Sequence, residues 1–166
     1  MKLRLALAAA VAAVVLAPAS AGATLPQQPD IHDLKLKRTI LNDPKVSANV
    51  KSIVRLGGFG GVSGPIYADL TRDGRDDVLV PIASGGTAGV VAFYVYSYHF
   101  GGLRNLLVRN EVYKVGLRVK DGNVVVTYPI YRANDPNCCP SRLERRTLRF
   151  NGVRLVRIKT VVVRPG

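Results

Sequence analysis

The chain has 166 residues, 48% of them hydrophobic, and its 24 Lys and Arg against 11 Asp and Glu give a net charge of +13. A hydrophobic share of this size excludes an intrinsically disordered chain. Two cysteines exclude a disulfide-dense scaffold, and two histidines exclude a His-rich metal site. The length suits one domain with one hydrophobic core.

The first 23 residues have the pattern of a secretory signal peptide. Lys2 and Arg4 form a short positive segment, residues 5–17 are apolar, and residues 18–23 are small. The apolar stretch is shorter than the ~20 residues of a membrane-spanning helix, which favours cleavage after Ala23. No cysteine stands at that position to carry a lipid. The mature protein is therefore predicted to be secreted or extracellular, with envelope association as the narrower option.

Residues 24–51 form an N-terminal lead-in whose structure the sequence leaves open. Its first seven residues are largely polar and contain two prolines. The hydrophobic positions within residues 31–41 fit the alternation of a strand and equally fit one face of a helix. The glycine-rich stretch 57–61 then ends any element that continues into it.

From residue 65 onward the pattern is that of β-structure. Runs rich in β-branched and aromatic residues are separated by turn residues, and Asp121-Gly122 and Asn151-Gly152 are strong hairpin signals because these residues tolerate positive φ. Residues 52–166 are therefore predicted to form a mainly β domain, a single antiparallel meander of seven or eight strands that makes a curved sheet or partly closed barrel. The expected strands are residues 66–69, 77–82, 90–98, 112–119, 123–128, 145–150 and 153–163.

The acidic stretch 69–77 is a candidate calcium site. Oxygen side chains at relative positions 1, 3, 5 and 9, with glycine at position 6, match the spacing of a calcium loop. The four candidate ligands are Asp69, Thr71, Asp73 and Asp77. No glutamate stands at the twelfth position. The competing interpretation is a structural turn whose carboxylates accept hydrogen bonds from backbone N–H groups, and both remain open.

Cys138 and Cys139 are adjacent and bracketed by Pro136 and Pro140. Four interpretations compete: a vicinal disulfide, two free thiols, intermolecular bridges, and a metal site. Export to an oxidising compartment favours the bridged forms, and the bracketing prolines restrict the loop in favour of a bond between the two neighbours.

The C-terminal 25 residues carry eight Lys and Arg against one Glu. Such a field attracts anions, although cations also serve simply to solvate a sheet and protect its edges. Nucleic acid is disfavoured as a partner because few aromatic residues are interleaved with these charges. The candidate anion-binding residues are Arg145, Arg149, Arg154, Arg157 and Lys159.

Several of these segments together resemble a known group of proteins. The acidic loop with its following strand, the glycine-containing stretch 84–89, the paired-cysteine segment 135–141 and the closing hairpin 148–156 resemble exported actinobacterial proteins akin to the LppP/LprE lipoproteins. The acidic loop alone loosely resembles FG-GAP and VCBS-type hairpins, which are often associated with Ca²⁺. The resemblance implies an envelope or secreted protein and supplies no catalytic residues.

The leading functional hypothesis is a secreted, non-enzymatic β domain that binds an anionic partner. The partner classes considered are an anionic cell-wall polymer, an anionic lipid and an acidic protein. The alternative is a secreted enzyme or redox accessory that uses Cys138 and Cys139.

Overall fold

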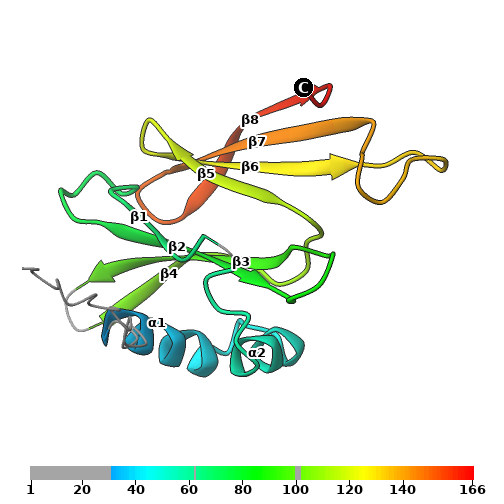
Figure 1. The fold of residues 1–166 in the computed structure, drawn as a ribbon. Helices are drawn as coiled ribbons and strands as arrows, with labels where there is room; N and C mark the ends of the chain where they lie inside the picture. The colour runs from blue at the N-terminus through cyan, green and yellow to red at the C-terminus, as the bar shows by residue number, and fades with distance from the viewer. Residues whose placement is uncertain (1–30, 62, 100–101) are drawn as a thin grey trace, which may run out of the picture.

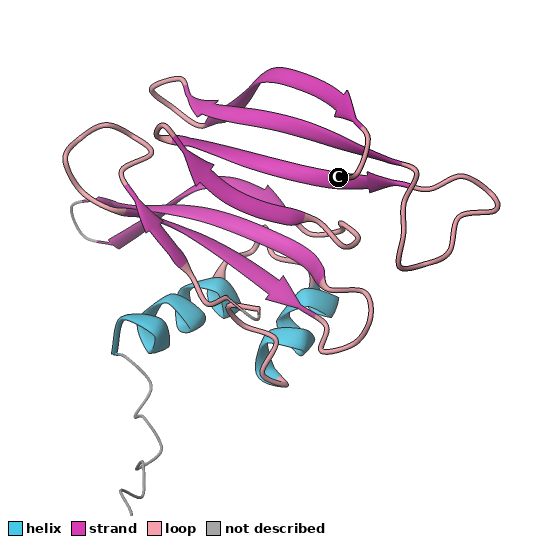
Figure 2. Ribbon diagram, turned by 45° about the horizontal axis from the view of Figure 1, so that its top comes forward, coloured by secondary structure: helices cyan, strands magenta, loops and turns pink. Residues whose placement is uncertain are grey.

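The computed structural model describes residues 31–61, 63–99 and 102–166. These residues form three stacked layers (Figure 1): two helices, a four-stranded sheet that we call sheet A, and a second four-stranded sheet, sheet B. Sheet A is the middle layer, as Figure 2 also shows. The predicted signal peptide, residues 1–23, lies outside the described residues.

The helical layer consists of α1 (Ile31–Asn42) and α2 (Ala48–Arg55). Leu36 and Ile40 stand four residues apart, so they share one face of α1, and both are fully buried against sheet A. Of the two patterns that residues 31–41 allow, the helical one therefore forms. Ser47 caps α2 by accepting a hydrogen bond from the Val50 N–H. Helix α2 crosses residue 51, where the lead-in was expected to end.

Sheet A contains β1 (Ile66–Ala68), β2 (Asp77–Ala83), β3 (Val90–His99) and β4 (Gly102–Arg109) in that order, all antiparallel. Its central strands are covered on both faces. Val78 and Val80 pack towards the helices, whereas Leu79 between them packs towards sheet B, and all three are fully buried.

Sheet B contains β5 (Gly116–Lys120), β6 (Asn123–Ile130), β7 (Arg142–Phe150) and β8 (Leu155–Val163), again antiparallel and in chain order. Asp121 and Gly122 both have positive φ in the β5–β6 turn, as the hairpin signal predicts. Sheet B packs one face on sheet A. The core between the sheets includes Phe93 and Val95 of sheet A and Val124, Val126, Leu148 and Leu155 of sheet B.

The predicted mainly β, antiparallel meander is confirmed. The structure adds that the described strands divide into two open four-stranded sheets rather than one. The reason is visible in β2 and β3, which are apolar on both faces and need cover from both sides. Strand β4 was not among the expected strands. No helix among the described residues is long and apolar enough to cross a membrane.

A polar cluster fastens the helical layer to sheet A. The Oδ2 atom of Asp43, in the turn between the helices, accepts hydrogen bonds from the Tyr96 hydroxyl at 3.0 Å and the Asn105 amide at 2.8 Å. Asn110 accepts one from the Tyr94 hydroxyl at 2.8 Å. Burial raises the pKa of both tyrosines, and the negative charge of Asp43 raises it further.

We expect Asp43→Ala to lower the free energy of unfolding by about 1–3 kcal/mol, because the Tyr96 hydroxyl and the Asn105 amide both lose their acceptor. Chemical denaturation measures the change. In a Tyr96→Phe background the same substitution should cost less, because one of the two orphaned donors is gone. Equal losses in the two backgrounds would contradict the role assigned to this hydrogen bond.

Candidate functional site

The acidic loop joins β1 to β2, and its carboxylates accept hydrogen bonds from the loop's own backbone. Asp77 is 1% exposed, and its Oδ2 accepts from the N–H groups of Leu70 and Thr71, both at 2.8 Å. Asp69 accepts from the N–H groups of Asp73 at 3.1 Å and Gly74 at 3.0 Å. Asp73 accepts from the Arg75 N–H at 2.9 Å. These are the carboxylate–backbone hydrogen bonds that the structural-turn interpretation expects.

Among the residues that the structure describes, no group of three or more His, Cys, Asp or Glu could hold a metal ion. The calcium hypothesis for Asp69, Thr71, Asp73 and Asp77 therefore gains no support. The buried Thr71 hydroxyl has no hydrogen-bond partner among the described residues. A buried hydroxyl of this kind ordinarily forms its hydrogen bond with a bound water.

We expect Asp77→Ala to lower the free energy of unfolding by about 2–3 kcal/mol, because two N–H groups lose a charged acceptor. The exposed neighbour Asp76 is the matched control, and Asp76→Ala should change little. Thermal unfolding with EDTA and with millimolar Ca²⁺ completes the test. A melting temperature that rises with Ca²⁺, and stops doing so in Asp77→Ala, would instead support the calcium site.

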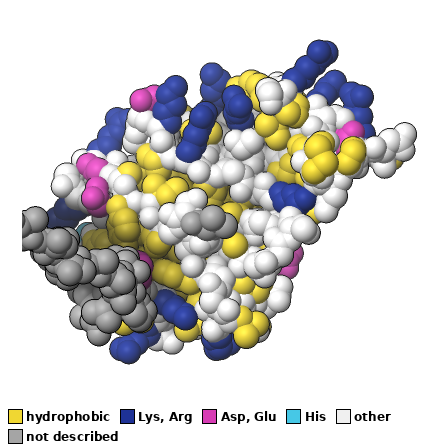
Figure 3. All heavy atoms as spheres, viewed as in Figure 1, with side chains coloured by type: hydrophobic (Ala, Val, Ile, Leu, Met, Phe, Trp, Pro, Cys, Tyr) yellow, Lys and Arg dark blue, Asp and Glu magenta, His cyan; other side chains and the backbone are white. Residues whose placement is uncertain are grey.

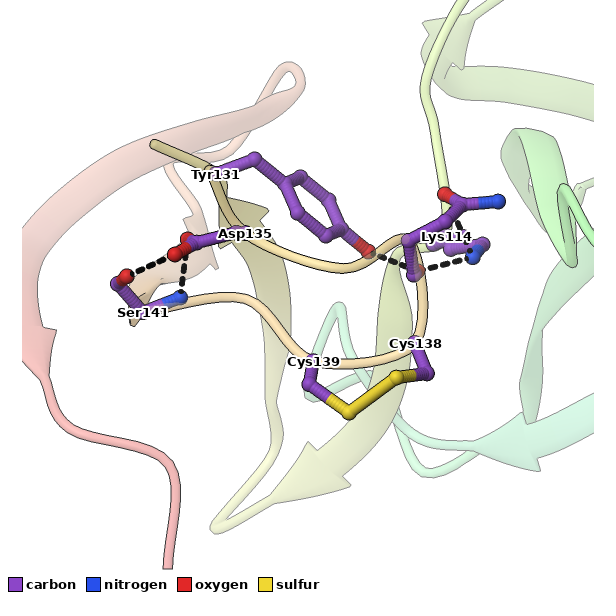
Figure 4. Close-up of a disulfide and its surroundings, with 7 residues drawn as sticks. Lys114, Tyr131, Asp135, Cys138, Cys139 and Ser141 are labelled. Atoms are coloured by element: carbon purple, nitrogen blue, oxygen red, sulfur yellow. Dashed lines mark hydrogen bonds between the residues drawn. A yellow bond between two sulfur atoms is a disulfide. The ribbon is translucent and has the colours of Figure 1, made fainter. Parts of the chain in front are cut away.

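The paired-cysteine loop, residues 131–141, joins β6 to β7 and projects from the end of sheet B (Figure 1). The structure joins the sulfurs of Cys138 and Cys139, whose Cα atoms are 3.8 Å apart (Figure 4). Both residues are exposed. The disulfide is thus presented to solvent at the far turn of the loop.

Two polar residues hold this loop in place. Asp135 closes its base: its carboxylate accepts from the Ser141 hydroxyl at 2.5 Å and from the N–H groups of Ser141 and Arg132, both at 2.8 Å. The Ser141 hydroxyl bond is the main reason that the pKa of Asp135 lies below its usual value. Asn137 ties the tip to the body, because its backbone carbonyl accepts from Lys114 Nζ at 2.6 Å (Figure 4). The same carbonyl accepts from the hydroxyl of Tyr131, the first residue of the loop, at 3.0 Å.

We predict that the protein isolated without reductant carries the Cys138–Cys139 bond, and intact-mass measurement checks it. The expected result is a monomer that is two hydrogens lighter than the dithiol and takes up no alkylating group until it is reduced. A monomer that is alkylated twice without reductant, or a covalent dimer, would contradict the bond.

The five residues of the predicted basic cluster lie on two different surfaces. Three of them, Arg145, Arg149 and Lys159, lie on the outer face of sheet B. Leu148 is buried against sheet A, so its neighbours on either side point away from the core. Lys159 lies opposite Thr147, which shares this outward face. On β5, Leu117 and Val119 point inward, so Arg118 and Lys120, which alternate with them, point to the same outer face. We call the resulting set the cationic face: Arg118, Lys120, Arg145, Arg149 and Lys159.

No Asp or Glu of the four strands stands on the cationic face. Glu144 is on the opposite face of β7, where its carboxylate pairs with Arg146 at 2.6 Å. That hydrogen bond is the main cause of the lowered pKa of Glu144. Figure 3, drawn in the orientation of Figure 1, shows Lys and Arg side chains along the upper margin, over sheet B. The positive charge of this face is therefore not neutralised by carboxylates within the strands.

Arg154 and Arg157 lie elsewhere, in a groove between the edge strands of the two sheets. A bulge in β8 leaves Ile158 without a register partner, so Arg157 lies opposite the inward-facing Leu148. We call this space the edge groove. It has a volume of about 540 Å³ and is lined by Lys45, residues 105–109 and residues 154–157.

Sequence reasoning missed the cations that the other segments contribute. Arg118 and Lys120 alternate with Leu117 and Val119, and this strand pattern was sufficient to place them on one outer face. Lys45 and Arg109 are far apart in the sequence and meet only through the packing of α1, α2 and β4, so no local signal identifies them.

Fold and surface together define a small β protein with two stacked sheets and a cationic outer face. The chain is 31% identical over 108 residues to Lipoprotein CseA of Streptomyces avermitilis and 34% identical over 107 residues to Lipoprotein CseA of Streptomyces coelicolor. The matches cover 64% and 63% of this chain, and 49% and 46% of the relatives. The chain thus spans about half the length of the curated relatives it matches.

No protein-family model matches the chain, and no solved structure matches it. The relatives come from an actinobacterial genus and are named lipoproteins, which agrees with the general kind of protein that the sequence resembles. The narrower resemblance to the LppP/LprE group is not confirmed.

Proposed function

We propose that this protein is exported, acts at the cell envelope without enzymatic activity, and binds anionic lipid head groups through the cationic face. The signal-peptide pattern and the lipoprotein names of the relatives support the location. We also propose that this protein is related to the LppP/LprE group.

The observation that carries the proposal is the two-dimensional spread of the cations. Arg118 and Lys120 stand on β5, Arg145 and Arg149 on β7, and Lys159 on β8. Neighbouring strands lie about 4.8 Å apart, so the charges cover a width of roughly 15 Å. A single linear polymer would contact one row of such a face, whereas a planar anionic surface contacts all of it.

An exposed aliphatic side chain stands beside the cations. Val161 lies directly across from Arg145 on the same face and is 38% exposed. Thr127, the other cross-strand neighbour of Arg145, is uncharged. A cationic face with an exposed valine among its charges suits the head-group region of a bilayer, where charge attraction and shallow apolar contact act together.

We expect the protein to bind vesicles that contain anionic phospholipid and to ignore purely zwitterionic vesicles, with binding weakened by salt. Each basic residue at such a surface contributes about 1 kcal/mol, so the triple variant Arg118→Gln, Arg145→Gln, Lys159→Gln should bind on the order of 100-fold more weakly. Vesicle sedimentation measures both effects.

The matched control removes three charges elsewhere: Lys51→Gln and Arg55→Gln on α2, with Arg72→Gln in the acidic loop. It has the same net charge as the test variant and should retain vesicle binding. Equal losses in both variants, or no binding to anionic vesicles at low salt, would overturn the proposal. Binding to a soluble anionic wall polymer or an acidic protein in place of vesicles would identify the partner as one of the other two classes.

A further inference from the structure

The edge groove has open backbone edges along both sides. Strand β4 is the last strand of sheet A and β8 the last strand of sheet B. Within the part of the chain that the structure describes, no further strand pairs with either one. The outward backbone N–H and C=O groups of such strands can pair with an added strand.

The charged residues that line the edge groove are all cations. Lys45 enters from the turn between the helices, Arg109 from the end of β4, and Arg154 and Arg157 from the start of β8. All four are exposed, and none of the described lining residues is Asp or Glu. Leu106, Leu107 and Leu155 form buried apolar surface beneath them.

We propose that the edge groove binds an extended acidic peptide segment of a partner protein, which adds as a strand to one of the two open edges. This inference goes beyond the lipid binding proposed above and uses different residues. Five consecutive residues of β4 line the groove. At about 3.3 Å per residue they match an extended segment of roughly five residues.

The two open edges favour a peptide over other anions. Charge alone would admit any polyanion, including a phosphate polymer. A row of backbone donors and acceptors at strand spacing is matched by another polypeptide backbone, which contributes main-chain hydrogen bonds, while the pockets between alternate side chains select its sequence. The four cations then select for carboxylates on the incoming strand.

The same cations disfavour a second copy of this chain as the occupant. Strand β8 itself carries Arg157 and Lys159, so an edge-to-edge pair of two copies would place like charges near one another. Like-charge contacts of this kind discriminate against the wrong partner and admit an acidic strand.

The test uses a labelled eight-residue peptide in which threonine and glutamate alternate, with fluorescence anisotropy as the readout on the full protein. We expect it to bind at least tenfold more tightly than the same peptide with glutamine in place of glutamate. Methylation of alternate backbone nitrogens should abolish binding, because it removes the main-chain donors. Arg154→Gln with Arg157→Gln should weaken binding about tenfold.

The double variant Lys51→Gln, Arg55→Gln on α2 carries the same charge change and should bind the peptide like the parent protein, and circular dichroism checks that both variants fold. Equal weakening in the two variants would overturn the proposal, as would undiminished binding of the methylated peptide. Tighter binding of inorganic polyphosphate than of the peptide would also overturn it, in favour of a phosphate polymer. This test measures peptide binding, whereas the earlier test measures vesicle binding. Either proposal can therefore be refuted without refuting the other.

Discussion

The architecture depends on two strands that are apolar on both faces. In β2 the side chains of Val78 and Val80 point one way and Leu79 points the other, and all are fully buried. A strand of this kind cannot lie at the surface of a single sheet, because one face would remain in water. The helices cover one side and sheet B covers the other. The outward face of sheet B is then the only sheet face in the described region left uncovered by another layer, which is why its cations reach solvent.

Much of the β-structure could be predicted because its local signals are strong. The Asp121-Gly122 hairpin and the aromatic run of β3 appear where the sequence places them. Strand β4 was missed because a bulge opposite Val95 and Tyr96 interrupts its alternation, so that the adjacent Leu106 and Leu107 are both buried on the same side. Helix α1 was ambiguous because its few hydrophobic positions fit two periods, and only contact with sheet A decides between them.

The candidate surface shows the same limit of sequence reasoning. Counting residues along β8 would place Arg157 and Lys159 on one face, since they are two positions apart. The bulge at Ile158 shifts the register, so Arg157 lines the edge groove and Lys159 joins the cationic face. A bulge of this kind depends on the neighbouring strand and leaves no clear mark in local composition. The number of cations was thus readable from the sequence, and their division into two surfaces was not.

The order of the strands has a consequence for assembly. In both sheets every strand pairs with its neighbour in the sequence, so each pairing closes only a short loop and contact order stays low for a β protein. A chain that is synthesised N-terminus first can build both helices and sheet A, the elements from α1 to β4, before sheet B has emerged. During that interval Leu79, Phe93 and Val95 lack their cover. The half-formed protein therefore exposes an aggregation-prone apolar face until the C-terminal sheet folds onto it.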